Sequence, residues 1–327
     1  MCIRDRIWEI KEWATLVAML AGLAALLPLA LILLRTKPFR SLGGPISEYA
    51  CTRREFFKYA RTNGLLMWLY LPLILVLFAL HVYVVPIDKV LPMMIVNGVV
   101  WWFLLVNLIG FFLFRRWYKK QARESGLTLA SLGISYREDR FGLDWAQIGR
   151  TVLLAALLFA FVYLIQHLLE AIFIVDYRFI FPFASDLTPY RGLMFLIYFP
   201  LLLIGFLLMS LFLHGQFRRP MKDTWLKTFV SWSVSNVLAM IIPLILFLLI
   251  QYVPLLAVGI VPFTGPGGML ASFTMNLFHI IGVLIMVIPI STLFYQLTGK
   301  IYLGALVNAA LVAWMFTSAQ VIAPIPV

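Results

Sequence analysis

Two histidines and a glutamate lie inside long apolar segments, where ionisable side chains are rare and costly. His167 and Glu170 are three residues apart and therefore share one helix face, while His279 lies in a later apolar segment. A His-x-x-Glu pair with a second histidine could bind a divalent metal ion, or could relay protons, because imidazole titrates near neutrality. The same side chains could instead form interhelical hydrogen bonds or line a water-filled vestibule. These alternatives stay open at the level of sequence.

The segments that carry these residues have the length and composition of membrane spans. The chain is 63% hydrophobic and 12% charged, and its apolar residues come in runs of about twenty, enough to cross a hydrocarbon core as a helix. We therefore expect an all-α polytopic bundle. Its eight expected spans are 14–34, 64–85, 93–114, 151–174, 192–213, 228–252, 269–293 and 302–323.

Lysine and arginine are distributed unevenly between the loops. Of the 26 basic residues, 20 fall in the segments 35–63, 115–150, 215–227 and 295–301. Basic loops stay on the cytoplasmic side, so we predict that these loops are cytoplasmic and that both termini are extracytoplasmic. We expect a multi-pass protein of the bacterial cytoplasmic membrane whose partners are lipids, with anionic lipid at the basic loops. The net charge of +12 does not indicate nucleic acid, because no single soluble face gathers the basic residues.

Depth within the spans divides the polar side chains into two groups. The outer-half cluster is predicted to contain His81, Asn97, Gln166, His167, Glu170, Asn276 and His279. An inner-half group contains Asn107, Ser231, Ser233, Ser235, Asn236 and Asn308. Small and amide residues of the second kind are typical of helix packing. Walker, dinucleotide-binding, His-Glu-x-x-His and Gly-x-Ser-x-Gly motifs are absent from the sequence, and no cofactor is expected.

The start of the chain has two unusual stretches. Residues 1–6 (MCIRDR) resemble a translated sequencing adapter, so we expect a metagenomic fragment whose single transmembrane domain covers 7–327. The following stretch, IWEIKEW (7–13), resembles the start of the membrane region that follows an extracytoplasmic α/β-hydrolase domain in some bacterial dienelactone-hydrolase-like proteins. That resemblance implies an upstream hydrolase domain holding the catalytic Ser, Asp and His, so it assigns no catalytic residue to this chain.

A second resemblance rests on two distant segments. Leu132-Gly133-Ile134 followed by Trp145, and TGKIY (298–302) followed by ALVNA (305–309), are similar to parts of the CPBP family of intramembrane proteases (CAAX-protease and bacteriocin-processing). The Glu-Glu-x-x-x-Arg motif of that family is absent, and Asn236 and Asn308 occupy the regions where histidines are expected. The resemblance therefore implies a degenerate relative that keeps the fold without the protease site.

Three functional interpretations follow. The leading one is a membrane domain that anchors an extracytoplasmic hydrolase and presents lipophilic substrate to it. The second is a transporter or permease that uses the outer-half cluster. The third is a CPBP-like intramembrane protease, or its inactive relative, in which Glu170, His279 and Asn308 converge, with glutamate activating water and histidine or asparagine stabilising the oxyanion.

Overall fold

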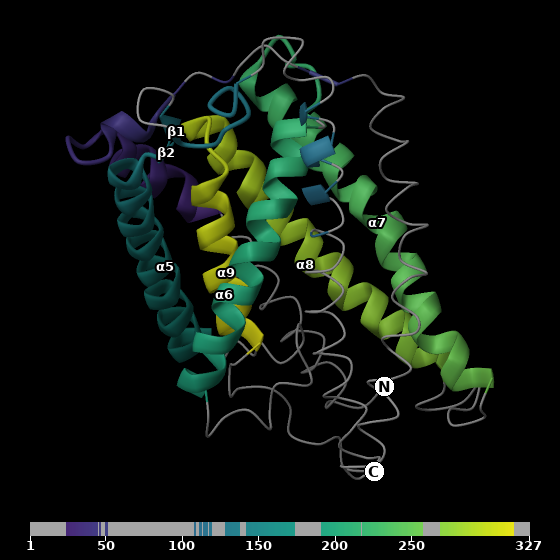
Figure 1. Ribbon diagram of the computed structural model, residues 1–327. Helices are drawn as coiled ribbons and strands as arrows, with labels where there is room; N and C mark the ends of the chain where they lie inside the picture. Colours follow the sequence, from purple (N-terminus) through teal and green to yellow (C-terminus); the bar gives the residue numbers. More distant parts are fainter. Residues whose placement is uncertain are drawn as a thin grey trace.

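The computed structural model of the chain describes residues 24–44, 46, 50–51, 108, 111–112, 114–116, 118–119, 128–137, 142–173, 191–216, 218–257 and 269–316 (Figure 1). Within these residues the fold is predominantly helical. The elements are a helix at Ala24–Arg35, the 3-10 helix η1 (Arg40–Leu42), strands β1 (Tyr136–Arg137) and β2 (Gly142–Leu143), α5 (Trp145–Phe173), α6 (Arg191–Ser210), the π-helix η6 (Leu211–Gln216), α7 (Trp225–Ala257), α8 (Met269–Thr298) and α9 (Tyr302–Phe316).

Three of the described segments are long and apolar enough to cross a membrane: Trp145–Ile165, Tyr198–Gln216 and Ile281–Thr298. Two shorter apolar helices, Ala24–Arg35 and Tyr302–Trp314, accompany them. The helical architecture is confirmed for the described residues, and the length and apolar composition of these helices fit a membrane protein. The expected spans 64–85 and most of 93–114 lie outside the described residues. The number of eight spans and the side on which the termini lie therefore stay predictions.

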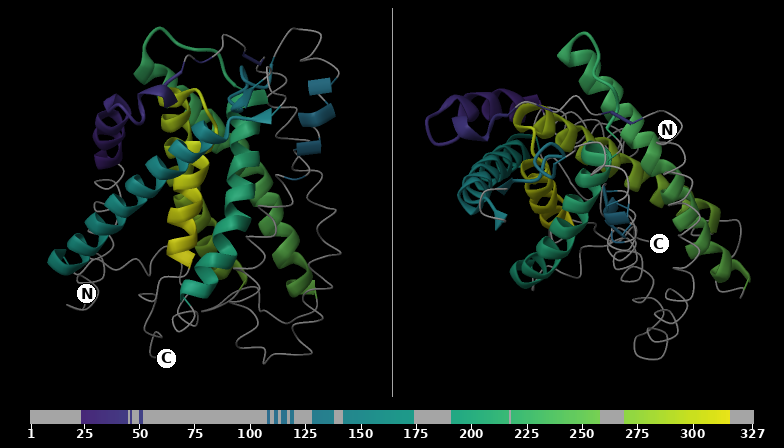
Figure 2. Two further views of the ribbon diagram at one scale, coloured as in Figure 1. Left: turned by 60° about the vertical axis from the view of Figure 1, so that its left-hand side comes forward. Right: turned by 45° about the horizontal axis from the view of Figure 1, so that its top comes forward.

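Helix α9 is the centre of the described bundle and packs against α5, α6 and α8, while α7 packs along α8 (Figure 2). Small side chains allow this close approach. A Cβ atom added to Gly304 would lie 2.8 Å from the Cα of Ser291 on α8. Ala305, Ala309 and Ala313 are fully buried. A short helix lined by small residues can thus be enclosed on several sides.

The exposed apolar side chains fit a lipid environment. Val152, Leu153, Leu157 and Leu164 of α5 are exposed in the absence of a membrane. At one end of the bundle the exposed side chains also include Trp145 and Trp225. Tryptophan is enriched where hydrocarbon meets head groups. The exposed positions of these two residues at the start of α5 and α7 fit such a boundary.

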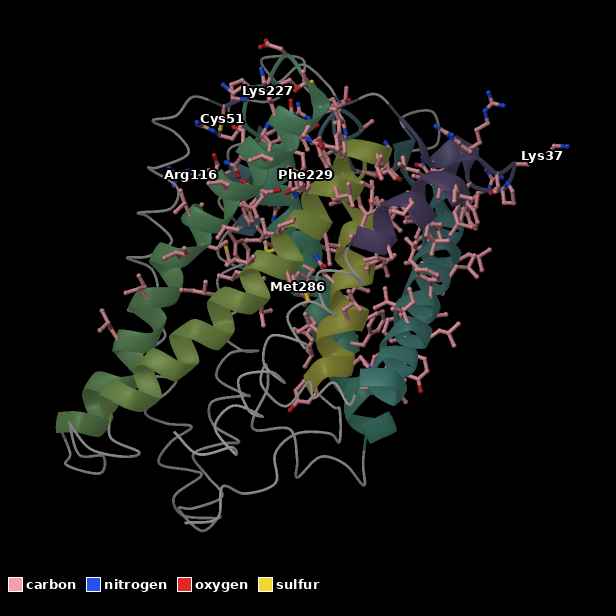
Figure 3. All side chains as sticks on the ribbon, turned by 180° about the vertical axis from the view of Figure 1, so that it is seen from behind. Lys37, Cys51, Arg116, Lys227, Phe229 and Met286 are labelled. Carbon is pink, nitrogen blue, oxygen red and sulfur yellow. The ribbon has the colours of Figure 1, made fainter. Side chains whose placement is uncertain are left out.

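The basic segments of the sequence meet at one end of the bundle, which we call the basic end. Ser41 accepts a hydrogen bond of 2.7 Å from the Arg150 guanidinium, joining the first basic loop to the second. The backbone amide of Cys51 donates to the carbonyl of Arg218 at 2.8 Å. Lys37, Arg116 and Lys227 lie toward this end, whereas Met286 lies deeper (Figure 3). Charge patterning thus identified segments that fold together.

A compact loop closes the basic end over α8 and α9. Strands β1 and β2 form a small antiparallel hairpin that the all-α prediction did not include. The Gly133 carbonyl accepts from the amide of Ile301 at 3.1 Å, and Gly133 has a φ of 91°, which favours glycine. Gly299 ends α8 with a φ of 66°, its amide donating to the Tyr295 carbonyl at 2.7 Å. The segments around Gly133 and Ile301 are therefore neighbours.

Candidate functional site: a buried polar cluster at the basic end

His214 is buried near the basic end. The helix that contains it does not stop where α6 ends, at Ser210. It continues as the π-helix η6, whose six residues are all buried. π-helical turns inside helices are frequent at functional sites, since they redirect side chains from the regular helical face. Gly215 permits this packing: a Cβ there would lie 3.2 Å from the Leu132 carbonyl of the covering loop. The local fold thus encloses a histidine.

Two aromatic rings from different helices lie against the imidazole of His214. Its imidazole stacks on the ring of Tyr295 from α8, with centroids 4.9 Å apart and planes at 14°. The indole of Trp232 from α7 lies 6.5 Å from His214 and 6.3 Å from Tyr295. We call His214, Trp232 and Tyr295 the ring cluster. Its members hold η6, α7 and α8 together on one level of the bundle.

Arg218 adds a buried positive charge to the ring cluster. Its side chain is only 1% exposed, and its guanidinium donates a 2.8 Å hydrogen bond to the Tyr295 hydroxyl. The Arg218 carbonyl accepts from the Cys51 amide, and two residues further on the carbonyl of Pro220 accepts from the Trp232 Nε1 at 3.2 Å. A buried guanidinium is costly without good partners. Hydrogen bonds of the Arg218 side chain and of its carbonyl hold the residue in this buried position.

A second polar layer lies about one helical turn deeper. Each ring has a polar residue four positions away along the chain, on the side away from the basic end. The pairs are His214 with Ser210, Trp232 with Asn236, and Tyr295 with Ser291. We call Ser210, Asn236, Ser291 and Asn308 the deep polar layer, and all four are nearly or fully buried. Asn308 belongs to α9 and donates to the Val287 carbonyl at 2.7 Å and to the Ser291 hydroxyl at 2.8 Å.

Within the part of the chain that the structure describes, several buried polar atoms in these two layers have no hydrogen-bond partner. They are both ring nitrogens of His214, both amide atoms of Asn236, the hydroxyl of Ser210 and the Oδ1 of Asn308. An unsatisfied buried group costs about 1–3 kcal/mol, and native proteins contain few of them. Because these atoms gather in one place, we take the cluster as a candidate binding site. Imidazole, amide and guanidinium together offer hydrogen-bond donors suited to an oxyanion.

The structure describes only some of the candidate residues that were singled out from the sequence. Asn308 is buried and hydrogen-bonded across helices, in the way the packing interpretation predicts. His81 and Asn97 lie outside the described residues. The remaining candidates lie on α5 or α8, with side chains outside the described part: Gln166, His167, Glu170, Asn276 and His279. The metal site, the outer-half cluster and the convergence of Glu170, His279 and Asn308 therefore stay predictions. Among the described residues, no three His, Cys, Asp or Glu side chains form a metal-binding group.

The sequence interpretation overlooked His214 and Arg218. It ended the fifth span at residue 213 and counted Arg218 in the basic segment 215–227, so that His214 was assigned to neither. A signal was present for His214, because it directly follows an apolar run and could have been assigned to the span. Arg218 follows the end of η6, so helical spacing could not have placed it.

Comparison of the chain with protein-family models, curated proteins and solved structures gives no match. Both family resemblances therefore stay predictions.

Proposed function

We propose that this chain is a multi-pass protein of the bacterial cytoplasmic membrane that binds the anionic head of an amphiphile at its basic end. The observation that carries the proposal is the buried cluster of His214, Asn236 and Arg218. Within the described residues the imidazole and the amide have no hydrogen-bond partner, and the guanidinium of Arg218 donates to Tyr295. Anionic oxygens complement these groups, and arginine pairs with phosphate or carboxylate in a charge-assisted, often bidentate geometry.

The position of the site supports an amphiphile over a water-soluble anion. The ring cluster lies at the end of the apolar segments Tyr198–Gln216 and Ile281–Thr298. There the acyl chains of a lipid would contact apolar side chains, and its head group would contact polar ones. Exposed lysines at Lys222 and Lys227 surround this end. They attract anionic lipid, whose head group can then reach the buried guanidinium.

The proposal is tested by lipid-dependent stability. The purified protein in neutral detergent is titrated with phosphatidic acid or with zwitterionic phosphatidylcholine, and the midpoint of thermal unfolding is followed by tryptophan fluorescence. A ligand that binds only the folded state raises this midpoint with concentration. We expect phosphatidic acid to raise it and phosphatidylcholine to leave it nearly unchanged. Equal effects of the two lipids would contradict the proposal.

Arg218→Gln and Lys227→Gln form a matched pair for this test, because each removes one positive charge at the basic end. Lys227 is exposed and Arg218 is buried. We expect Arg218→Gln to abolish the selective effect of phosphatidic acid and Lys227→Gln to keep most of it. If both variants keep it, general surface charge and not the site binds the lipid. Arg218→Lys, which keeps a buried charge, covers the case in which the glutamine variant does not fold.

The functions inferred from sequence alone remain separate proposals. An anchoring role beside an extracytoplasmic hydrolase is tested by recovering the upstream reading frame, and a frame without a secreted folded domain would remove its support. Transport through the outer-half cluster is tested by uptake measurements on Glu170→Gln. Binding of an amphiphile at the basic end does not depend on a hydrolase partner, because the basic loops are predicted to be cytoplasmic and the hydrolase domain extracytoplasmic.

A further inference from the structure

Exposed positive charges gather at a corner of the basic end where η1 packs against α5. We call Arg35, Lys37, Arg40 and Arg150 the cationic corner, and all four side chains are exposed. The Arg150 guanidinium donates at 2.7 Å to the hydroxyl of Ser41, the residue that follows Arg40, so the two segments are in direct contact. Lys37 points away from the bundle at this corner (Figure 3).

The positive charge of the cationic corner is not balanced within its own segments. Residues 24–44 and 145–165 contain no aspartate or glutamate. The acid next to them in sequence, Asp144, accepts from the amide of Gln147 and interacts with Lys300. Cations that share one corner repel each other, so an anion lying among them lowers the electrostatic free energy. The corner therefore complements a ligand that carries more than one negative charge.

Below the cations, both helices expose apolar side chains toward the surroundings. On α5, Leu153 and Leu157 follow Arg150 after three and seven residues, so the three side chains share one exposed face of the helix. The two leucines lie about 5 and 10 Å along α5 from Arg150, within the roughly 15 Å of one leaflet. On the first helix, Ile32 precedes Arg35 by three residues and is 62% exposed. Cations with apolar side chains beneath them match an anionic lipid.

We propose that the cationic corner binds a lipid with two phosphates, whose head group lies across η1 and α5 and whose acyl chains lie along Leu153 and Leu157. Two phosphates in one head group engage Arg150 and the cations of the first segment together, so the second contact forms at a high effective concentration. Arginine pairs with phosphate through charge-assisted hydrogen bonds. Ser41 accepts from Arg150 and keeps its own hydroxyl hydrogen as a further donor.

A lipid with one phosphate leaves one of the two segments without an anion, and it should bind more weakly. The cationic corner shares no residue with the ring cluster, so this binding is independent of the proposed function.

The test compares tetraoleoyl cardiolipin, which has two phosphates, with dioleoyl phosphatidylglycerol at equal phosphate concentration. Binding of each lipid to the full chain in neutral detergent is measured by native mass spectrometry. We expect the Kd of cardiolipin to be about tenfold lower, a modest gain for two linked contacts because exposed charges interact weakly. Equal binding of the two lipids to the unmodified protein would overturn the inference. That result would leave the phosphatidic acid test of the proposed function unaffected.

Arg150→Gln and Arg116→Gln form a matched pair, because each replaces one exposed arginine at the basic end. Arg116 lies on the opposite side of this end from Lys37 (Figure 3). We expect Arg150→Gln to remove most of the preference for cardiolipin and Arg116→Gln to keep it. If both variants keep it, or both lose it, the cationic corner is not the site. Arg218→Gln should also keep the preference, and its loss in that variant alone would place cardiolipin at the ring cluster and overturn the inference.

Discussion

The contact between α8 and α9 gives a sharp prediction, because it depends on the missing side chain of one residue. A Cβ at Gly304 would meet the Ser291 Cα at 2.8 Å and the Ser291 carbonyl at 3.3 Å. These are backbone atoms of a packed helix and cannot rotate away. Gly304→Ala must therefore push α9 from α8, which also lengthens the bonds of Asn308 to Val287 and Ser291.

The magnitude follows from a comparison with Gly282, a glycine in α8 whose added Cβ would meet nothing within 4 Å. Both substitutions exchange glycine for alanine in a helix, so the intrinsic gain of about 1 kcal/mol largely cancels between them. The difference isolates the clash, which costs about 1–3 kcal/mol when a packed interior cannot adjust. We expect Gly282→Ala to be neutral or stabilising and Gly304→Ala to be destabilising.

The assay is reversible unfolding in mixed micelles, with the denaturing detergent sodium dodecyl sulfate titrated against a mild one and helicity followed by circular dichroism. Both variants and the parent are measured under one protocol, so that detergent effects cancel. If Gly304→Ala is as stable as Gly282→Ala, α9 does not pack on α8 as described, and the arrangement of the deep polar layer would be refuted with it.

Three further predictions concern the polar residues. Tyr295→Phe removes the hydroxyl that accepts from the buried Arg218 and should lower the unfolding free energy by about 2 kcal/mol, measured in the same titration; an unchanged value would show that the hydroxyl is not an important partner. Asn236→Leu should instead stabilise the lipid-free protein by about 1 kcal/mol, because it replaces an amide without partners by an apolar group; a clear loss would indicate that the amide is already satisfied. Burial lowers the pKa of Lys300 below its ordinary value of 10.5, partly opposed by the Asp144 carboxylate. Between the lowered pKa of Lys300 in the folded protein and 10.5 in the unfolded chain, the unfolded chain binds more protons, so the stability of the folded protein should rise with pH toward 10.5. Thermal unfolding of Lys300→Met, measured from about pH 8 to about pH 10, should lack that rise. A parallel pH dependence in both proteins would contradict the prediction.

The helices were predictable because hydrocarbon imposes a simple rule on the chain. Each apolar run of about twenty residues must satisfy its own backbone. Helices α6, α7, α8 and α9 begin within three residues of the start expected from hydropathy, whereas α5 begins six residues earlier, at Trp145. The distribution of lysine and arginine likewise indicated which loops would gather at one end. Both signals are local in sequence and do not depend on how the helices pack.

The candidate site was not predictable in the same way, because it depends on contacts between distant segments. Hydropathy predicted the end of a span at residue 213, whereas the helix continues through His214 to Gln216. The loop around Leu132 packs on Gly215 in this extension, a contact that the local sequence does not indicate. Nothing in the pattern around Tyr295 indicated that its hydroxyl would meet Arg218, 77 positions away. Asn236 and Asn308 were recognised as inner-half polar residues, but their shared depth with Ser210 emerges only from the packed helices.

The most direct test of the account is the location of bound lipid. A phosphatidic acid carrying a photoreactive group near its ester is incorporated with the protein into phosphatidylcholine nanodiscs, and cross-linked peptides are identified by mass spectrometry. We predict saturable labelling of the segments 211–216 and 225–236, suppressed by excess unlabelled phosphatidic acid but not by phosphatidylcholine. Labelling confined to the lipid-facing surface of α5, or unaffected by competition, would contradict a specific site at the basic end.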